Sequence, residues 1–184
     1  MEIRLGEHIR YTNEESIITK DFNVDYILKH PSYGSPQYSN DIALVRLAEE
    51  ADISVYTPAC LPDTNEDFTG QMALLTGWGV LYEYDEYSEY SDYESDTLQE
   101  LDNLPIVSDA SCSSSVENAF SGVVTSDMLC AGGEAGKDGC VGDKGGPLVV
   151  ENSSTSQKIL VGVAANLTCA GFVVPSIYSE VSSK

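Results

Sequence analysis

The chain has 184 residues, 42% of them hydrophobic, and carries 30 acidic against 9 basic residues. A chain of this length can bury a real core, and its formal net charge of −21 argues against nucleic acid and anionic membranes as partners, because both would repel it. Basic protein surfaces are favoured instead. No apolar stretch is long enough for a membrane span or a signal peptide, so we expect any secretion signal to lie upstream of this sequence.

The first third of the chain reads as β-structure. Strands are predicted at residues 3–5, 16–28 and 42–47, with turn residues between them. Residues 48–68 contain Pro58 and Pro62 and read as a linker. Strand character resumes near Gln71 and is closed by Gly77-Trp-Gly79.

Residues 82–96 hold five tyrosines and seven acidic residues in fifteen positions. Such a segment repels itself and cannot be buried, which predicts an extended, mobile loop. Two interpretations are open: a solvated insertion, or a surface that recruits basic partners. The acidic flanks also suit tyrosine sulfation.

The second half continues the β pattern. A strand is predicted at residues 98–107, a polar, serine-rich loop at 112–130, and paired strands at 148–150 and 159–165 around a turn at 152–156.

The stretch Asp138-Gly-Cys-Val-Gly-Asp-Lys-Gly-Gly-Pro147 carries the clearest chemical signal. Its four glycines and one proline exclude a helix or a regular strand and predict a shaped loop. Glycines on either side of Lys144 let successive backbone N–H groups converge on one point. Such a concavity suits a developing oxyanion.

This loop resembles the active-site loop of trypsin-like serine proteases, which reads Gly-Asp-Ser-Gly-Gly-Pro and presents its serine as the nucleophile. Further landmarks of that family occur in the same order: Asn40-Asp-Ile-Ala-Leu44, Ala59-Cys-Leu-Pro62, Gly77-Trp-Gly79, Leu98-Gln-Glu-Leu101 and Met128-Leu-Cys-Ala131. The resemblance implies an all-β fold of two antiparallel barrels. Residues 1–47 would form about half of the first barrel, 48–70 the linker between barrels, and 71–184 a nearly complete second barrel.

The resemblance also assigns a catalytic site, but an incomplete one. Lys144 stands where the family has its serine, and Asp41 stands at the position of the triad aspartate. The segment that carries the family's histidine is absent, and neither His8 nor His30 matches it. The oxyanion hole would be formed by the N–H groups of Gly142 and Lys144.

Asp138 matches the base of the specificity pocket, which gives trypsin-like members their preference for Arg or Lys. Ser176 replaces a glycine of the pocket wall and should narrow the pocket. We expect Lys144 to form an ion pair with Asp41 or Asp138. The alternative is a lysine that faces solvent.

The five cysteines indicate an oxidising compartment. By resemblance Cys112 pairs with Cys130 and Cys140 with Cys169. Cys60 remains, either as a tether for an N-terminal segment or as a buried free thiol. Asn152-Ser-Ser154 and Asn166-Leu-Thr168 are glycosylation sequons typical of secreted proteins. Some family members bind calcium near the positions of Glu7, Glu14 and Glu15, but acidic loops are usually just solvated, and no metal or cofactor is predicted.

Two functions follow from the resemblance. The first is a non-catalytic serine protease homologue: a secreted binding or cofactor module in an extracellular proteolytic cascade, such as those of invertebrate immunity, with a protease or zymogen as partner. The second is a trypsin-like endopeptidase that cleaves after Arg or Lys, whose catalytic Ser and His are missing through truncation or a sequence artefact.

Overall fold

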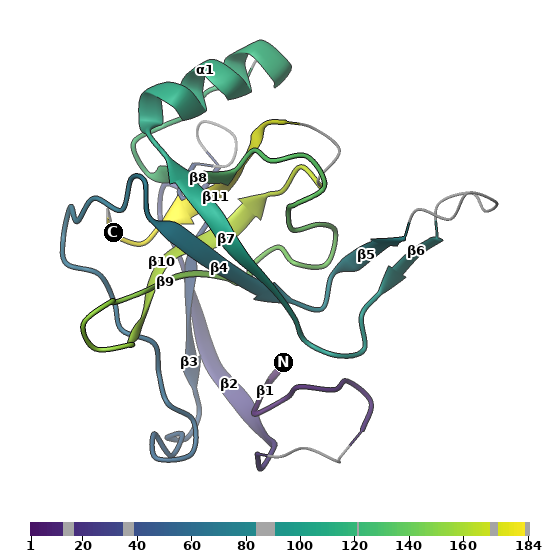
Figure 1. The fold of residues 1–184 in the computed structure, drawn as a ribbon. Helices are drawn as coiled ribbons and strands as arrows, with labels where there is room; N and C mark the ends of the chain where they lie inside the picture. The colour runs from purple at the N-terminus through teal and green to yellow at the C-terminus, as the bar shows by residue number, and fades with distance from the viewer. Residues whose placement is uncertain (13–16, 35–38, 84–90, 121, 170–172, 183–184) are drawn as a thin grey trace.

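The computed structural model describes residues 1–12, 17–34, 39–83, 91–120, 122–169 and 173–182. Strands dominate these residues, and one helix interrupts them (Figure 1). In chain order the elements are β1 (Glu2–Leu5), β2 (Lys20–Lys29), β3 (Ala43–Leu47), β4 (Met72–Gly77), β5 (Val80–Glu83), β6 (Ser91–Glu94), β7 (Gln99–Val107), α1 (Asp109–Phe120), β8 (Met128–Gly132), β9 (Pro147–Glu151), β10 (Lys158–Asn166) and β11 (Pro175–Glu180).

Six strands close into an antiparallel barrel in the order β10-β11-β8-β7-β4-β9. Alternate residues of β4 and β9 point into it: Ala73 and Leu75 are buried, as are Leu148 and Val150. Closure removes the free strand edges that an open sheet would expose. The main hydrophobic core of the described chain lies inside this barrel.

The first three strands form a separate antiparallel sheet in the order β1-β2-β3. Phe22 is buried there and meets the ring of Tyr56 edge to face, with 6.1 Å between ring centroids. Much of the sheet is uncovered, and its exposed apolar side chains include Tyr26, Leu28 and Leu44. The all-β fold class is confirmed: the described chain contains a closed six-stranded barrel and a separate three-stranded sheet.

The linker between sheet and barrel is fastened to the barrel wall. Cys60 donates its backbone N–H to the Lys158 carbonyl at 2.8 Å and accepts a hydrogen bond from the Leu160 N–H at 2.9 Å. Further along, Phe68 enters the barrel core.

Helix α1 occupies part of the stretch for which the sequence predicted a polar loop, so that prediction was wrong. Ser108 caps the helix: its hydroxyl accepts from the Ser111 N–H at 3.3 Å, and its carbonyl accepts from the Cys112 N–H at 2.8 Å. Cys112 and Val116, four residues apart, are buried on one face. Tertiary burial therefore outweighs the weak helix propensity of a serine-rich segment.

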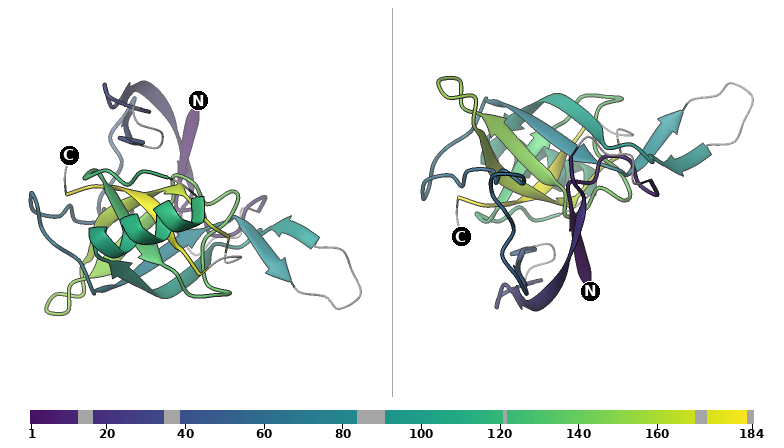
Figure 2. Two further views of the ribbon diagram at one scale, coloured as in Figure 1. Left: turned by 90° about the horizontal axis from the view of Figure 1, so that it is seen from above. Right: turned by 90° about the horizontal axis from the view of Figure 1, so that it is seen from below.

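The ends of the acidic tyrosine segment also differ from the predicted irregular loop. β5 and β6 pair as a two-stranded antiparallel ribbon that projects away from the barrel (Figures 1 and 2). Residues 84–90, between these strands, lie outside the described part of the chain. Arg10 holds the base of the ribbon, because its N–H donates to the Asp96 carbonyl at 2.7 Å and its guanidinium contacts Glu94 at 2.9 Å.

Within the described residues there is no helix with the length and apolar composition that crossing a membrane requires.

Candidate functional site

The glycine-rich loop folds as two consecutive β-turns that share Asp143. The Asp143 N–H donates to the Cys140 carbonyl at 3.0 Å, and the Gly146 N–H donates to the Asp143 carbonyl at 2.9 Å. The third residues of these turns, Gly142 and Gly145, have φ angles of 95° and 86°. Type II turns require a positive φ at that position, which only glycine adopts at low cost.

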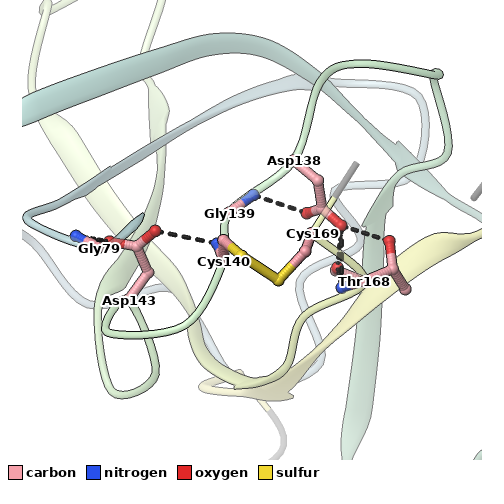
Figure 3. Close-up of a disulfide and its surroundings, with 8 residues drawn as sticks. Gly79, Asp138, Gly139, Cys140, Asp143, Thr168 and Cys169 are labelled. Atoms are coloured by element: carbon pink, nitrogen blue, oxygen red, sulfur yellow. Dashed lines mark hydrogen bonds between the residues drawn. A yellow bond between two sulfur atoms is a disulfide. The ribbon is translucent and has the colours of Figure 1, made fainter. Parts of the chain in front are cut away.

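The side chain of Asp143 turns back under the loop and explains the motif Gly77-Trp-Gly79. One carboxylate oxygen accepts from the Gly79 N–H at 2.8 Å and the other from the Cys140 N–H at 3.0 Å (Figure 3). A Cβ on Gly77 would lie 2.0 Å from Oδ1 of Asp143, and a Cβ on Gly79 would lie 2.4 Å from its Cγ. Both glycines therefore make room for this carboxylate.

The predicted oxyanion donors lie on the outside of these turns. Within the described residues, the backbone N–H groups of Gly142 and Lys144 form no hydrogen bond. Hydrogen bonds from Gly145 N–H to the Ala164 carbonyl, 2.8 Å, and from Ala164 N–H to the Gly146 carbonyl, 2.9 Å, fasten the loop to β10. The N–H groups of Gly142 and Lys144 are thus unpaired within the described residues, in a loop that is hydrogen-bonded to β10.

The predicted ion pair of Lys144 is absent. The side chain of Lys144 is exposed, and no acidic oxygen of the described chain lies within 4.0 Å of its ammonium. The prediction was wrong: Asp138, one of the two predicted partners, already accepts hydrogen bonds from Thr168 and Ser176, and the neighbouring Asp143 accepts from Gly79 and Cys140. Neither carboxylate needs the lysine.

Asp41 lies between the sheet and the barrel, immediately before β3. The hydroxyl of Ser179, on β11, donates to its carbonyl at 2.8 Å. Asp41 lines an open cavity of about 490 Å³ together with Gly145 and Val163, so the fold brings it close to the glycine-rich loop. In the described chain neither His8 nor His30 bonds to Asp41; the Nδ1 of His30 accepts from the Ser32 N–H at 3.2 Å.

Asp138 is the most heavily hydrogen-bonded acid of the site. Its Oδ1 accepts from the Gly139 N–H at 2.8 Å, while its Oδ2 accepts from Ser176 Oγ at 2.6 Å and from the N–H and hydroxyl of Thr168 at 3.0 and 2.5 Å. Ser176 was predicted from the sequence to lie in the wall of this pocket, whereas Thr168 was not predicted as a site residue. The one available signal was its place directly before Cys169, the predicted partner of Cys140.

Tyr178 lies beneath these acids. It is fully buried, and its hydroxyl has no partner in the described chain. Burial, followed by the negative charges of Asp138 and Asp143, raises the pKa of the phenol far above its ordinary value.

Both predicted disulfides are present. Cys112–Cys130 joins α1 to β8, and Cys140–Cys169 joins the glycine-rich loop to the segment after β10 (Figure 3). Cys60 is half-buried and forms no disulfide within the described residues.

The sequon asparagines lie at different places. Asn152 opens the β9–β10 turn, where its side-chain oxygen accepts from the Ser154 N–H at 2.9 Å, and Asn166 ends β10.

No group of three or more potential metal ligands gathers among the described residues. Glu14 and Glu15 lie outside them. The carboxylate of Glu7 contacts Arg4 at 3.1 Å.

The six-stranded barrel, the tandem turns and the hydrogen-bonded carboxylates beside them define a trypsin-like serine protease fold. The trypsin family model matches residues 1–184, and the chain belongs to this family.

The chain is 37% identical to Trypsin-3 of Salmo salar over 185 residues, covering 98% of the chain and 69% of that protein. It is 32% identical to the inactive CLIP domain-containing serine protease A28 of Anopheles gambiae over 183 residues, covering 97% of the chain and 46% of that protein. Human mannan-binding lectin serine protease 1 is 34% identical over 169 residues, covering 89% of the chain and 22% of that protein. The chain thus spans less than half of the last two relatives.

Proposed function

We propose that this chain belongs to a non-catalytic serine protease homologue that acts as a secreted binding or cofactor module in an extracellular proteolytic cascade. The feature that supports the proposal is Lys144, which by resemblance to the family takes the place of the nucleophilic serine in the glycine-rich loop. Acyl transfer needs a hydroxyl or thiol nucleophile and a base to accept its proton. Lys144 supplies neither a hydroxyl nor a thiol, and its side chain is exposed.

The hydrogen bonds around the site are consistent with a protein that keeps the protease fold but does not cleave peptides. The carboxylate of Asp143 is held by backbone N–H groups of the chain itself, and Asp138 is held by Thr168 and Ser176. The turns are therefore stabilised independently of any catalytic group. The similarity to an inactive CLIP domain-containing serine protease agrees with this interpretation.

The partner proposed for this module is a basic protein surface, such as that of a protease or zymogen. A net charge of −21 favours such partners, and the projecting β5–β6 ribbon carries the densest acidic segment of the chain. Cys60 is proposed as the tether of an N-terminal segment. Secretion, with glycans on Asn152 and Asn166, completes the proposal.

A second candidate is a trypsin-like endopeptidase, favoured by the identity to fish trypsins and by the acid at Asp138. A fluorophosphonate probe, which labels an activated serine covalently, separates the two. The full-length protein should remain unlabelled under conditions that label trypsin completely, because the nucleophile is absent. Stoichiometric labelling within this chain would favour the endopeptidase.

A further inference from the structure

The Oδ2 atom of Asp138 is saturated by donors of the chain itself. A carboxylate offers about four lone-pair sites, two on each oxygen. Four hydrogen bonds reach Asp138, and three of these converge on Oδ2, from the Thr168 N–H, the Thr168 hydroxyl and the Ser176 hydroxyl. No lone pair on that oxygen remains for an incoming donor.

From this arrangement we propose that Thr168 and Ser176 close the pocket at Asp138 against cationic side chains. A guanidinium or amidinium binds a carboxylate through two parallel N–H···O bonds, one to each oxygen. Here it would first have to displace the two hydroxyls from Oδ2. By resemblance Asp138 is the acid that would recognise Arg and Lys, but its Oδ2 already accepts hydrogen bonds from Thr168 and Ser176.

Both residues are held in place by the fold, and the Thr168 hydroxyl also lies 3.3 Å from the Val174 carbonyl. Ser176 is fully buried in β11 and lies opposite Ala131 of β8. Thr168 directly precedes Cys169, whose disulfide to Cys140 ties it to the loop that carries Asp138. The two residues also bond to each other, because the Thr168 N–H donates to Ser176 Oγ at 2.9 Å. The closure is therefore built into the covalent and hydrogen-bonded frame.

This closure concerns ligand selection and does not depend on whether the protein is catalytic. It implies that a basic partner does not insert an Arg or Lys side chain at Asp138. Such a partner would instead have to engage another acidic surface.

The test is a titration of the full-length protein with benzamidine, a neutral ring bearing one amidinium, followed by calorimetry. We expect no saturation at millimolar benzamidine for the unchanged protein. The double variant Thr168→Ala/Ser176→Gly should bind at least about tenfold more tightly, since hydrogen bonds to a charged acceptor typically contribute that much. Adding Asp138→Asn to this variant should abolish the gain.

Two matched control variants test whether the effect on benzamidine affinity comes from the hydroxyls of Thr168 and Ser176. Thr168→Ser keeps the hydroxyl and should bind benzamidine no better than the unchanged protein. Ser179→Gly removes another buried serine of β11, one that bonds to Asp41 rather than Asp138, and should also leave binding unchanged.

Tight binding of benzamidine by the unchanged protein would overturn the proposal. So would a folded double variant that gains no affinity. If the double variant does not fold, Thr168→Ala/Ser176→Ala, which also removes both hydroxyls, is compared with Thr168→Ser. Equal affinities in that pair would likewise overturn the proposal.

Discussion

The two glycines that flank Trp78 are explained by the half-buried carboxylate of Asp143. Asp143 fills the space where their side chains would be, and the Gly79 N–H is one of its two donors. The tripeptide Gly77-Trp-Gly79 is thereby tied to a loop 64 residues away in the sequence. This contact helps to shape the glycine-rich loop.

Gly79→Ala should therefore destabilise the protein by about 1–3 kcal/mol, the usual cost of forcing extra atoms into a packed site. The measurement is the free energy of unfolding in urea. In an Asp143→Ala background the same substitution should cost much less, because the carboxylate that clashes with the new methyl group is gone. An equal cost in both backgrounds would contradict this explanation.

Tyr178 gives a prediction of pH dependence. Its phenol has a raised pKa in the folded chain, so the neutral form is favoured there. In the unfolded chain the phenol ionises near pH 10. The stability that comes from keeping this phenol neutral is thus fully present below about pH 10 and is lost as the pH rises above it.

Tyr178→Phe should remove this loss while changing stability little at pH 7, because its hydroxyl has no partner in the described chain. Urea unfolding at pH 8 and pH 10.5 measures the difference. Tyr33→Phe, at an exposed tyrosine, is the control and should keep the alkaline loss. If Tyr178→Phe loses as much stability as the unchanged protein at pH 10.5, the phenol does not carry this dependence.

Among the elements, the β5–β6 ribbon is the one whose predicted role can be tested separately from its structure. Its base is held by Arg10 through Glu94 and Asp96, with a further contact from the Leu98 N–H to the His8 carbonyl at 2.7 Å. Five further acidic residues of the segment can be neutralised while Arg10, Glu94 and Asp96 are kept.

Neutralising those five acids as amides should weaken binding to a basic protein such as lysozyme, and the remaining binding should depend less on salt. Exposed charges more than about 10 Å apart are screened at ~0.1 M salt, so the loss should be largest at low ionic strength. The measurement is affinity against salt concentration. The substituted positions are Glu83, Asp85, Glu86, Glu89 and Asp92.

A control with the same change in net charge neutralises five exposed acids elsewhere. If it weakens binding as much as the ribbon variant does, the effect is one of total charge, and the ribbon is not a recruiting surface. The control positions are Glu50, Asp63, Glu100, Asp102 and Glu117.

At the scale of the whole molecule, many strands were predictable, but the β5–β6 ribbon, the start of β8 and the contacts between distant residues were not. Alternating apolar residues located β2, β3, β7, β9 and β10 to within a few residues of their observed ends. Helix α1 was missed because its stability comes from tertiary burial rather than from propensity.

In the candidate site, too, local features were predictable from the sequence and contacts between distant residues were not. The tandem turns could be foreseen from their glycines, since a positive φ is a local requirement. The saturation of Asp138 could not, because its donors lie 30 and 38 residues further along the chain and meet it only in the folded protein. For the same reason the predicted pairing of Lys144 failed.

We propose that this member of the trypsin family lacks the catalytic nucleophile. The most direct test is the pre-steady-state release of a leaving group from an arginine ester by the full-length protein. We predict no burst and a rate about 10⁶-fold below that of trypsin, the loss expected when the catalytic triad is removed. A burst with an amplitude of one leaving group per chain would reveal an acyl-enzyme and contradict the claim.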